Sequence, residues 1–128
     1  MPTFVIHEHN AKNLHWDFRL ESGGVLRSWA IPKQPTNNTD VKRLAIQVAD
    51  HAKDYANFQG EITEGYGKGT VKIWDKGSYK LESKSKDKIV FHLQGKRLKG
   101  KWVLVKANFK DKKTGKVNDK NWLLFRIS

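Results

Sequence analysis

The sequence predicts a mainly β fold: a compact barrel or sandwich of short, mostly antiparallel strands with one or two short helical turns. Short runs that are apolar, or that alternate between apolar and polar residues, recur between groups of Gly, Asn and Asp. Few stretches repeat apolar residues at helical spacing. The 128 residues also suit a single domain, residues 1–128, with one hydrophobic core.

The first half of the chain predicts four strands and one hairpin. Ser22-Gly23-Gly24 is typical of a tight hairpin turn, so the strands on either side of it should pair. Pro32 and Pro35 end the strand that follows this turn. The predicted strands cover residues 4–9, 15–21, 25–31 and 43–48.

The second half predicts five more strands. Lys76-Gly77 predicts a tight turn, and residues 83–88 predict a charged hairpin. We expect a flexible glycine-rich loop over 65–69 and a mobile lysine-rich loop over 108–121. The predicted strands cover residues 70–74, 78–82, 89–93, 102–107 and 122–127.

The charge balance indicates the kind of partner. Lys and Arg number 25 against 13 Asp and Glu, a formal charge of +12, which favours a polyanion and most simply a nucleic acid. The absence of cysteine excludes disulfides and thiolate metal sites and is compatible with a cytoplasmic protein. No apolar run approaches the roughly 20 residues that span a bilayer, and the N-terminus lacks a signal-peptide pattern. We expect a monomer.

One constellation predicts a metal site. Alternate side chains of a strand share a face, so His15, Asp17 and Arg19 should lie on one face and the apolar residues between them on the other. If the polar connector over 10–13 is a hairpin, His9 converges on the same face. Two imidazoles and a carboxylate suit a divalent manganese, iron or zinc ion.

Three basic residues are candidates for phosphate binding. Arg19 lies one pleat further along the same strand, where a guanidinium suits bidentate binding of a phosphate. From Arg19 alone, a surface ion pair with Glu8 or Glu21 is the better interpretation. Pattern alone does not distinguish Lys33 and Arg43 from the other basic residues.

His51 and Tyr55 form a second candidate pair. If residues 50–55 make a helical turn, the two side chains share a face. Histidine can protonate a leaving oxygen near neutral pH, and tyrosine can donate a hydrogen bond to a phosphate. A helical cap with a buried tyrosine is an equally good interpretation. His7 alternates with His9 and could line the same site, whereas His92 should face solvent and the tryptophans should pack in the core.

Five segments resemble a known family. They include Ser28-Trp29-Ala30-Ile31-Pro32-Lys33 and Gly69-Thr70-Val71-Lys72-Ile73-Trp74-Asp75. The chain resembles, over nearly its whole length, the 3′-phosphoesterase domain of bacterial ATP-dependent DNA ligase D and its stand-alone archaeal and bacterial relatives. The segments cover residues 9–21, 28–33, 42–45, 50–55 and 69–75.

The resemblance implies a fold, a reaction and a set of site residues. It implies a compact β-barrel with a manganese site, where cobalt or zinc could substitute, in a crescent-shaped groove. The reaction would remove a 3′-terminal ribonucleoside from RNA-tailed DNA ends of a primer-template, then the remaining 3′-phosphate, for a separate ligase and polymerase acting in trans. The matched metal ligands are His9, His15 and Asp17. The matched phosphate-binding and catalytic positions are Arg19, Lys33, Arg43, His51 and Tyr55.

The sequence also departs from the family and leaves rivals open. His7 stands where the family often has an acidic or amide residue, and the stretch over 63–67 is shorter than usual. One rival is an iron(II) oxygenase, which also uses two histidines and a carboxylate. A second rival is a non-catalytic nucleic-acid-binding barrel, which explains the charge and the aromatic residues but not the histidine–aspartate cluster.

Overall fold

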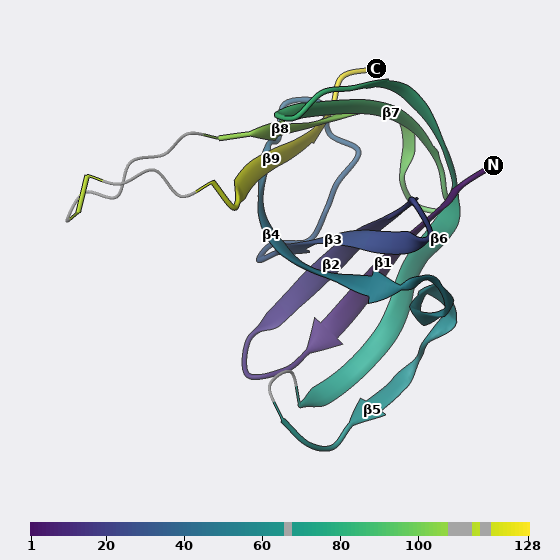
Figure 1. Cartoon of the computed structure of the whole chain (residues 1–128), viewed down its shortest axis with the longest axis vertical. Coiled ribbons are helices and arrows are strands. Elements are labelled where there is room, and N and C mark those ends of the chain that lie inside the picture. Colours follow the sequence, from purple (N-terminus) through teal and green to yellow (C-terminus); the bar gives the residue numbers. More distant parts are fainter. Residues whose placement is uncertain (66–67, 108–113, 116–118) are drawn as a thin grey trace.

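The computed structural model describes residues 1–65, 68–107, 114–115 and 119–128, and these form an antiparallel β-barrel (Figure 1). Eight strands follow one another around the barrel in the order β1-β2-β3-β4-β9-β8-β7-β6, and pairing of β1 with β6 closes it. The ninth strand, β5, pairs with β6 outside the ring. The strands are β1 (Thr3–Asn10), β2 (Leu14–Ser22), β3 (Val25–Ile31), β4 (Arg43–Ala52), β5 (Gly60–Ile62), β6 (Gly69–Lys84), β7 (Lys88–Gln94), β8 (Lys99–Lys106) and β9 (Asn121–Arg126).

The barrel closes because β6 is long enough to serve two neighbours. Its first part pairs with β1 and its second part with β7, and the predicted turn at Lys76-Gly77 is wrong because the strand continues through it. A Cβ on Gly77 would lie 2.0 Å from the carbonyl oxygen of Gln94. This glycine therefore permits a close approach of two backbones rather than a reversal of the chain.

Most other predicted strands are confirmed, with some shifts at their ends. The hairpin at residues 22–24 joins β2 and β3 as expected, while β4 extends to Ala52. The prediction of a helical turn over 50–55 is therefore wrong in its first half: a 3-10 helix, η1 (Lys53–Asn57), begins only after the strand. β5 was not predicted. Of the expected loop over 65–69, residues 66 and 67 lie outside the described residues and Gly69 already begins β6; most of the expected loop over 108–121 lies outside the described residues.

Large aromatic and aliphatic side chains fill the barrel. Phe18 and Phe91 stack with their ring centroids 5.8 Å apart, and neither is exposed. Four of the five tryptophans are buried, as expected for core packing, and Trp74 is half-buried against the same cluster. The expectation that His92 faces outward is also confirmed, since it contacts the exposed Glu82.

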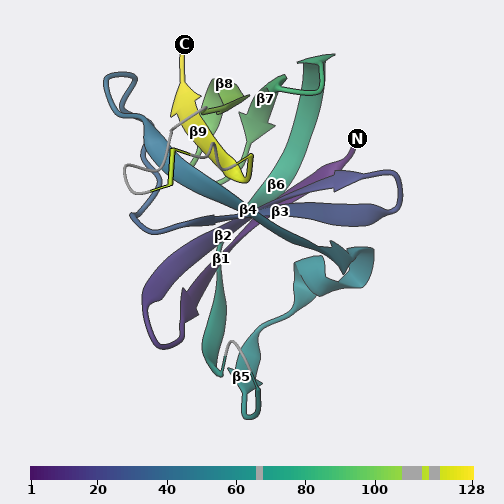
Figure 2. The same ribbon diagram turned by 60° about the vertical axis from the view of Figure 1, so that its left-hand side comes forward.

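A second, smaller apolar cluster lies outside the barrel wall and sets the position of η1. Ala56 of η1 packs on Val5 of β1 and Leu26 of β3, with Tyr55 and Ile73 against them. Figures 1 and 2 show the short coil of η1 and the extended β5 segment lying along one side of the barrel. This side of the wall is consequently covered by the chain that follows β4. No described helix is long and apolar enough to cross a membrane.

Candidate active site

The strand pairing brings the predicted metal ligands together on the outer face of the barrel wall. His9 of β1 lies opposite His15 of β2, and His7 lies opposite Asp17. Opposite residues of an antiparallel pair point to the same face of the sheet. The apolar residues of β2 between these positions point into the barrel core, as the alternation predicted.

Both histidines lie near Asp17 at separations close to those around one divalent ion. The Nε2 atom of His15 lies 3.3 Å from Oδ2 of Asp17, and Nδ1 of His9 lies 3.5 Å from the same oxygen. All candidate ligand atoms lie within 4.8 Å of one another. Ligands about 2.1 Å from a common ion sit roughly 3.0–3.4 Å apart at octahedral or tetrahedral angles. The donor types and the two distances to Asp17 therefore suit a divalent transition metal.

The backbone orients one of these imidazoles. Nδ1 of His15 lies 3.1 Å from the carbonyl oxygen of Asn13, which accepts its hydrogen. That bond leaves Nε2 pointing toward Asp17 and available as a ligand. The hydrogen bond that His15 donates to Asp17 raises the pKa of His15, so a metal ion binding at Nε2 would compete with a proton.

Asp17 remains ionised although it is nearly buried. Burial by itself would raise the pKa of its carboxyl group, but the hydrogen bond from His15 and the charge of Arg19 outweigh burial and lower the pKa. Only 6% of the residue is exposed. A buried, ionised carboxylate next to two imidazoles supplies negative charge where a metal ion would bind.

Arg19 is held rigidly beside this cluster. Its side chain is almost completely buried, which rules out the surface ion pair with Glu8 or Glu21. Nη1 donates to Oγ of Ser28 at 2.8 Å, and Nη2 donates to Oδ2 of Asp17 at 3.3 Å. Nε donates to a third partner, so these bonds use three of the five N–H groups. The guanidinium is thus fixed in orientation and keeps donors for a ligand.

The third partner of Arg19 is His7, which the sequence placed at the site without a role. Nδ1 of His7 accepts from Nε of Arg19 at 3.0 Å, and Nε2 lies 3.1 Å from the carbonyl oxygen of Phe58. A guanidinium only donates and a carbonyl only accepts, so His7 must be neutral with its hydrogen on Nε2. Burial, reinforced by the charge of Arg19, lowers the pKa of His7 to about 4. His7 therefore ties Arg19 to the segment between η1 and β5.

His51 and Tyr55 meet, but not on one helical face. A β-bulge pairs Val48 with Ser28 and His51 with Leu26, and this extra length turns His51 to the outer face. The rings of His51 and Tyr55 then stack 4.4 Å apart, and the guanidinium carbon of Arg19 lies 5.0 Å from the centre of the Tyr55 ring. Burial and the charge of Arg19 lower the pKa of His51, and burial raises the pKa of Tyr55.

Two further candidates lie apart from this group. Lys33 is exposed in the segment after β3, and Arg43 donates from Nε to the carbonyl oxygen of Gln34 at 2.8 Å. Arg43 also pairs with Leu124, whose side chain lies in the core, so its position on β4 belongs to the inner face. No hydrogen bond or ion pair among the described residues joins either of them to Asp17 or Arg19.

Sequence reasoning missed the groups that position the site. Ser28 accepts a hydrogen bond from Arg19, and the carbonyl oxygen of Phe58 accepts one from His7. The Phe58 ring stacks on Tyr55, with the ring centroids 5.0 Å apart. Ser28 carried one available signal, since it alternates with the core residue Trp29 in a strand predicted to pair with β2. Nothing local in the sequence pointed to Phe58, which is 51 residues from its partner.

The fold and site define a class: an antiparallel β-barrel that carries a potential metal centre and a buried arginine on the outside of its wall. Residues 7–106 match the family model described as the DNA Ligase D 3′-phosphoesterase domain. The chain belongs to this family.

Curated relatives agree with this assignment. The chain is 44% identical over 117 residues to the multifunctional non-homologous end joining protein LigD of Pseudomonas aeruginosa, covering 87% of this chain and 14% of that protein. It is 47% identical over 111 residues to the multifunctional non-homologous end joining DNA repair protein LigD of Mycobacterium tuberculosis, covering 83% and 15%. The LigD protein of Mycolicibacterium smegmatis is 38% identical over 136 residues, covering 97% and 16%. The chain thus spans about one seventh of the length of these relatives.

Proposed function

We propose that this chain is a metal-dependent phosphoesterase that trims DNA 3′ ends in end-joining repair. It removes a 3′-terminal ribonucleoside as a phosphodiesterase and then the exposed 3′-phosphate as a phosphomonoesterase, leaving a 3′-hydroxyl. The observation that carries the proposal is the contact between the His9–His15–Asp17 cluster and the buried guanidinium of Arg19, on a chain of this family. DNA ends are the proposed substrate, and a ligase and a polymerase are the expected partners.

Manganese is the proposed ion, and cobalt or zinc would also fit the nitrogen and oxygen donors of the cluster. When bound, the ion polarises a phosphate oxygen and lowers the pKa of a coordinated water. His9, His15 and Asp17 would hold it, with His15 oriented by the Asn13 carbonyl. The cluster supplies one negative charge, from Asp17, so an ion held there keeps a net positive charge that attracts a phosphate.

Arg19 and Tyr55 are the proposed residues that bind the phosphate. Arg19 stabilises the negative charge that develops on the phosphoryl oxygens, and its three bonds to protein groups keep it in place before the substrate arrives. The Tyr55 hydroxyl donates to a phosphate oxygen. Burial raises the pKa of Tyr55 above its ordinary value, so the hydroxyl keeps this hydrogen near neutral pH. Lys33 and Arg43 remain proposed phosphate contacts on the strength of the family resemblance alone.

His51 is the proposed general acid. In each step a water oxygen would form a bond to phosphorus and lose a proton to solvent, while the P–O bond to the departing oxygen breaks and that oxygen takes the proton of His51. The departing oxygen is the 5′ oxygen of the ribonucleoside in the first step and the 3′ oxygen of the DNA in the second. The pKa of His51 is lowered in the free protein, so the imidazole is mostly neutral near pH 7. The negative charge of a bound phosphate raises that pKa and favours the protonated form that the reaction needs.

One assay tests the function. An end-labelled primer-template that ends in a single ribonucleotide is incubated with the protein and manganese, and the products are resolved against markers with a 3′-phosphate and a 3′-hydroxyl. We expect the 3′-phosphate product to appear first and the 3′-hydroxyl product later. Binding of DNA without any product would favour the non-catalytic barrel, and iron-dependent oxygen uptake would favour the oxygenase.

A further inference from the structure

A basic hollow lies at the edge of β6, one strand away from the candidate active site. Its volume is about 490 Å³. Three of the six side chains around it are basic and one is a half-buried tryptophan. The lining residues are Ile73, Trp74, Asp75, Lys76, Lys96 and Arg97.

The single acid of this hollow does not offset its positive charge at the surface. Asp75 is only 3% exposed. Its Oδ1 accepts from the backbone N–H of Lys96 at 2.8 Å and of Lys76 at 2.9 Å, and its Oδ2 accepts from the N–H of Leu98 at 2.9 Å. The carboxylate is therefore turned toward backbone amides, while Lys96 and Arg97 are exposed to solvent.

A β-bulge presents the tryptophan to this hollow. The pairing of β1 with β6 shifts between Ile6, which pairs with Asp75, and His7, which pairs with Ile73, so Trp74 has no partner across the strands. The guanidinium carbon of Arg97 lies 4.6 Å from the centre of the Trp74 ring. Stacking limits the rotamers of Arg97 and leaves its N–H edge for an anion, so less entropy is lost when a phosphate binds.

The strand register connects the hollow to the active site. Asp17 pairs with His7, and His7 pairs with Ile73 at the rim of the hollow. Neighbouring strands lie about 4.8 Å apart, which places Ile73 about 10 Å across the sheet from Asp17. A nucleic-acid strand that ends at the metal cluster could therefore reach the hollow within a few nucleotides.

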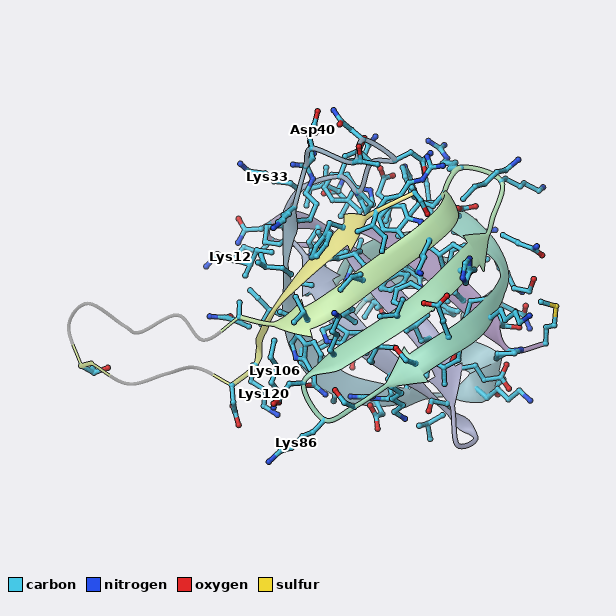
Figure 3. All side chains as sticks on the ribbon, turned by 90° about the horizontal axis from the view of Figure 1, so that it is seen from above. Lys12, Lys33, Asp40, Lys86, Lys106 and Lys120 are labelled. Atoms are coloured by element: carbon cyan, nitrogen blue, oxygen red, sulfur yellow. The ribbon has the colours of Figure 1, made fainter. Side chains whose placement is uncertain are left out.

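A second hollow provides a useful contrast. It has a similar volume of about 520 Å³ and lies beside η1, with Lys53 and Lys76 on its wall. Glu21 and Asp54 line it as well, and Lys53 forms an ion pair with Glu21 at 3.0 Å. Its lysines are balanced by carboxylates, so it does not favour a polyanion. Figure 3 shows other basic residues, such as Lys12, Lys33 and Lys86, pointing outward at separate places on the surface.

We propose that the hollow formed by Trp74, Lys76, Lys96 and Arg97 binds the phosphodiester backbone of the strand whose 3′ end lies at the His9–His15–Asp17 cluster. This inference rests on the proposed function. Arg97, stacked on Trp74, contacts a phosphate, and Lys96 adds charge beside it. Lys76 lines the hollow, but its ammonium donates to Oδ1 of Asn57 in the neighbouring hollow. The hollow makes affinity depend on strand length, because only a strand of several nucleotides occupies both places.

The test compares two strand lengths without turnover. Single-stranded DNAs of about three and about 12 nucleotides, both ending in a 3′-hydroxyl, are titrated with the protein, and the ratio of the two dissociation constants is measured. The variant carries Lys96→Gln and Arg97→Gln. The matched control carries Lys80→Gln and Lys88→Gln, which removes the same charge from exposed positions further along β6 and on β7.

In the hollow variant, we expect the ratio of the dissociation constants for the short and the long strand to fall about tenfold. The slope of log affinity against log salt should become shallower by about 0.7 for each lost phosphate contact. The control should keep the wild-type ratio. An equal loss in the control would mean that diffuse charge binds DNA, and an unchanged ratio in the hollow variant would mean that the strand passes elsewhere; either result overturns the inference. Because the strands are not substrates, a failure of the proposed chemistry would show in the turnover assay and not here.

Discussion

Both faces of β2 are buried, but burial has opposite effects on the free energy of folding at the two faces. On the inner face, Phe18 and its apolar neighbours are at most 7% exposed and lie in the barrel core. On the outer face, Asp17 and Arg19 are 6% and 3% exposed, and the ring of Tyr55 in η1 lies against Arg19. Burial stabilises the inner face directly through the apolar area removed from water. On the outer face it costs free energy, which hydrogen bonds must offset.

This difference separates stability from function along one strand. Each buried polar atom of the outer face has a specific partner, as the three bonds of Arg19 show. Such a network fixes geometry and pKa values, while contributing little net stability compared with an apolar replacement. We therefore expect changes on the inner face to act through the free energy of unfolding. Changes on the outer face should lower the reaction rate, and those that leave a buried partner unpaired should also lower the free energy of unfolding.

The largest effect should come from Asp17→Ala. It removes the only carboxylate of the metal cluster, so we expect manganese-dependent turnover to fall by more than about 10³-fold. Metal affinity, measured by calorimetry, should fall with it while thermal unfolding stays cooperative. Asp40→Ala, in the exposed loop before β4, is the control. Wild-type turnover in Asp17→Ala would remove Asp17 from the site.

His51→Ala should have the next largest effect. It should lower the turnover rate by about 10²–10⁴-fold if the imidazole is the general acid. Manganese affinity should stay near wild type, because His51 faces Tyr55 rather than the cluster. A nitrophenyl ester has a leaving group that needs no proton, so the loss on this substrate should be smaller. Equal losses on both substrates would exclude the acid role, and lost metal binding would make His51 a ligand.

The inner face is tested by Phe18→Ala. Removing a ring that stacks on Phe91 should lower the free energy of unfolding by about 3–5 kcal/mol, measured in denaturant. Phe18→Leu, which keeps most of the volume, should cost less than about 1.5 kcal/mol. The folded fraction of Phe18→Leu should turn over at the wild-type rate. A slow but fully stable Phe18→Leu would contradict the separation of the two faces.

Arg19→Ala should lose about 2–4 kcal/mol of transition-state stabilisation. The measurement is the single-turnover rate at saturating DNA. The charge-matched control is Arg27→Ala, on β3, whose guanidinium lies over the Trp29 ring. Arg19→Lys should recover only part of the rate because an ammonium cannot reach His7, Ser28 and Asp17 together. Equal rates in Arg19→Ala and wild type would rule out this role.

The smallest effect concerns His7, which positions Arg19 without touching the phosphate. His7→Asn keeps an acceptor near Nδ1 for Arg19, whereas His7→Phe keeps the ring edge against Tyr55 and removes both hydrogen bonds. We expect His7→Phe to lower kcat by about 10–100-fold with KM little changed, and His7→Asn to restore most of that loss. Equal kcat values in the two variants would show that the ring shape matters and the hydrogen bond does not.

The sequence alone determined the two faces of β2 and the grouping of His9, His15 and Asp17. A strand has a side-chain period of two, so alternation over residues 15–21 already separates polar from apolar side chains. A short connector then brings His9 opposite His15. These are local relations, and local relations can be read from spacing. The manganese assignment and the reaction remain predictions that rest on family resemblance.

Only the tertiary structure decided how the rest of the site is assembled. β-bulges interrupt the alternation of inner and outer side chains at His51 and Trp74. A bulge depends on the partner strand as well as on the strand that carries it. The continuation of β6 through Gly77 depends on the approach of Gln94. The sequence alone favoured a surface ion pair for Arg19, whereas its buried position beside Tyr55 of η1 depends on the tertiary structure. The hydrogen bond between His7 and Phe58 spans 51 residues, and no periodic pattern encodes a contact at that separation.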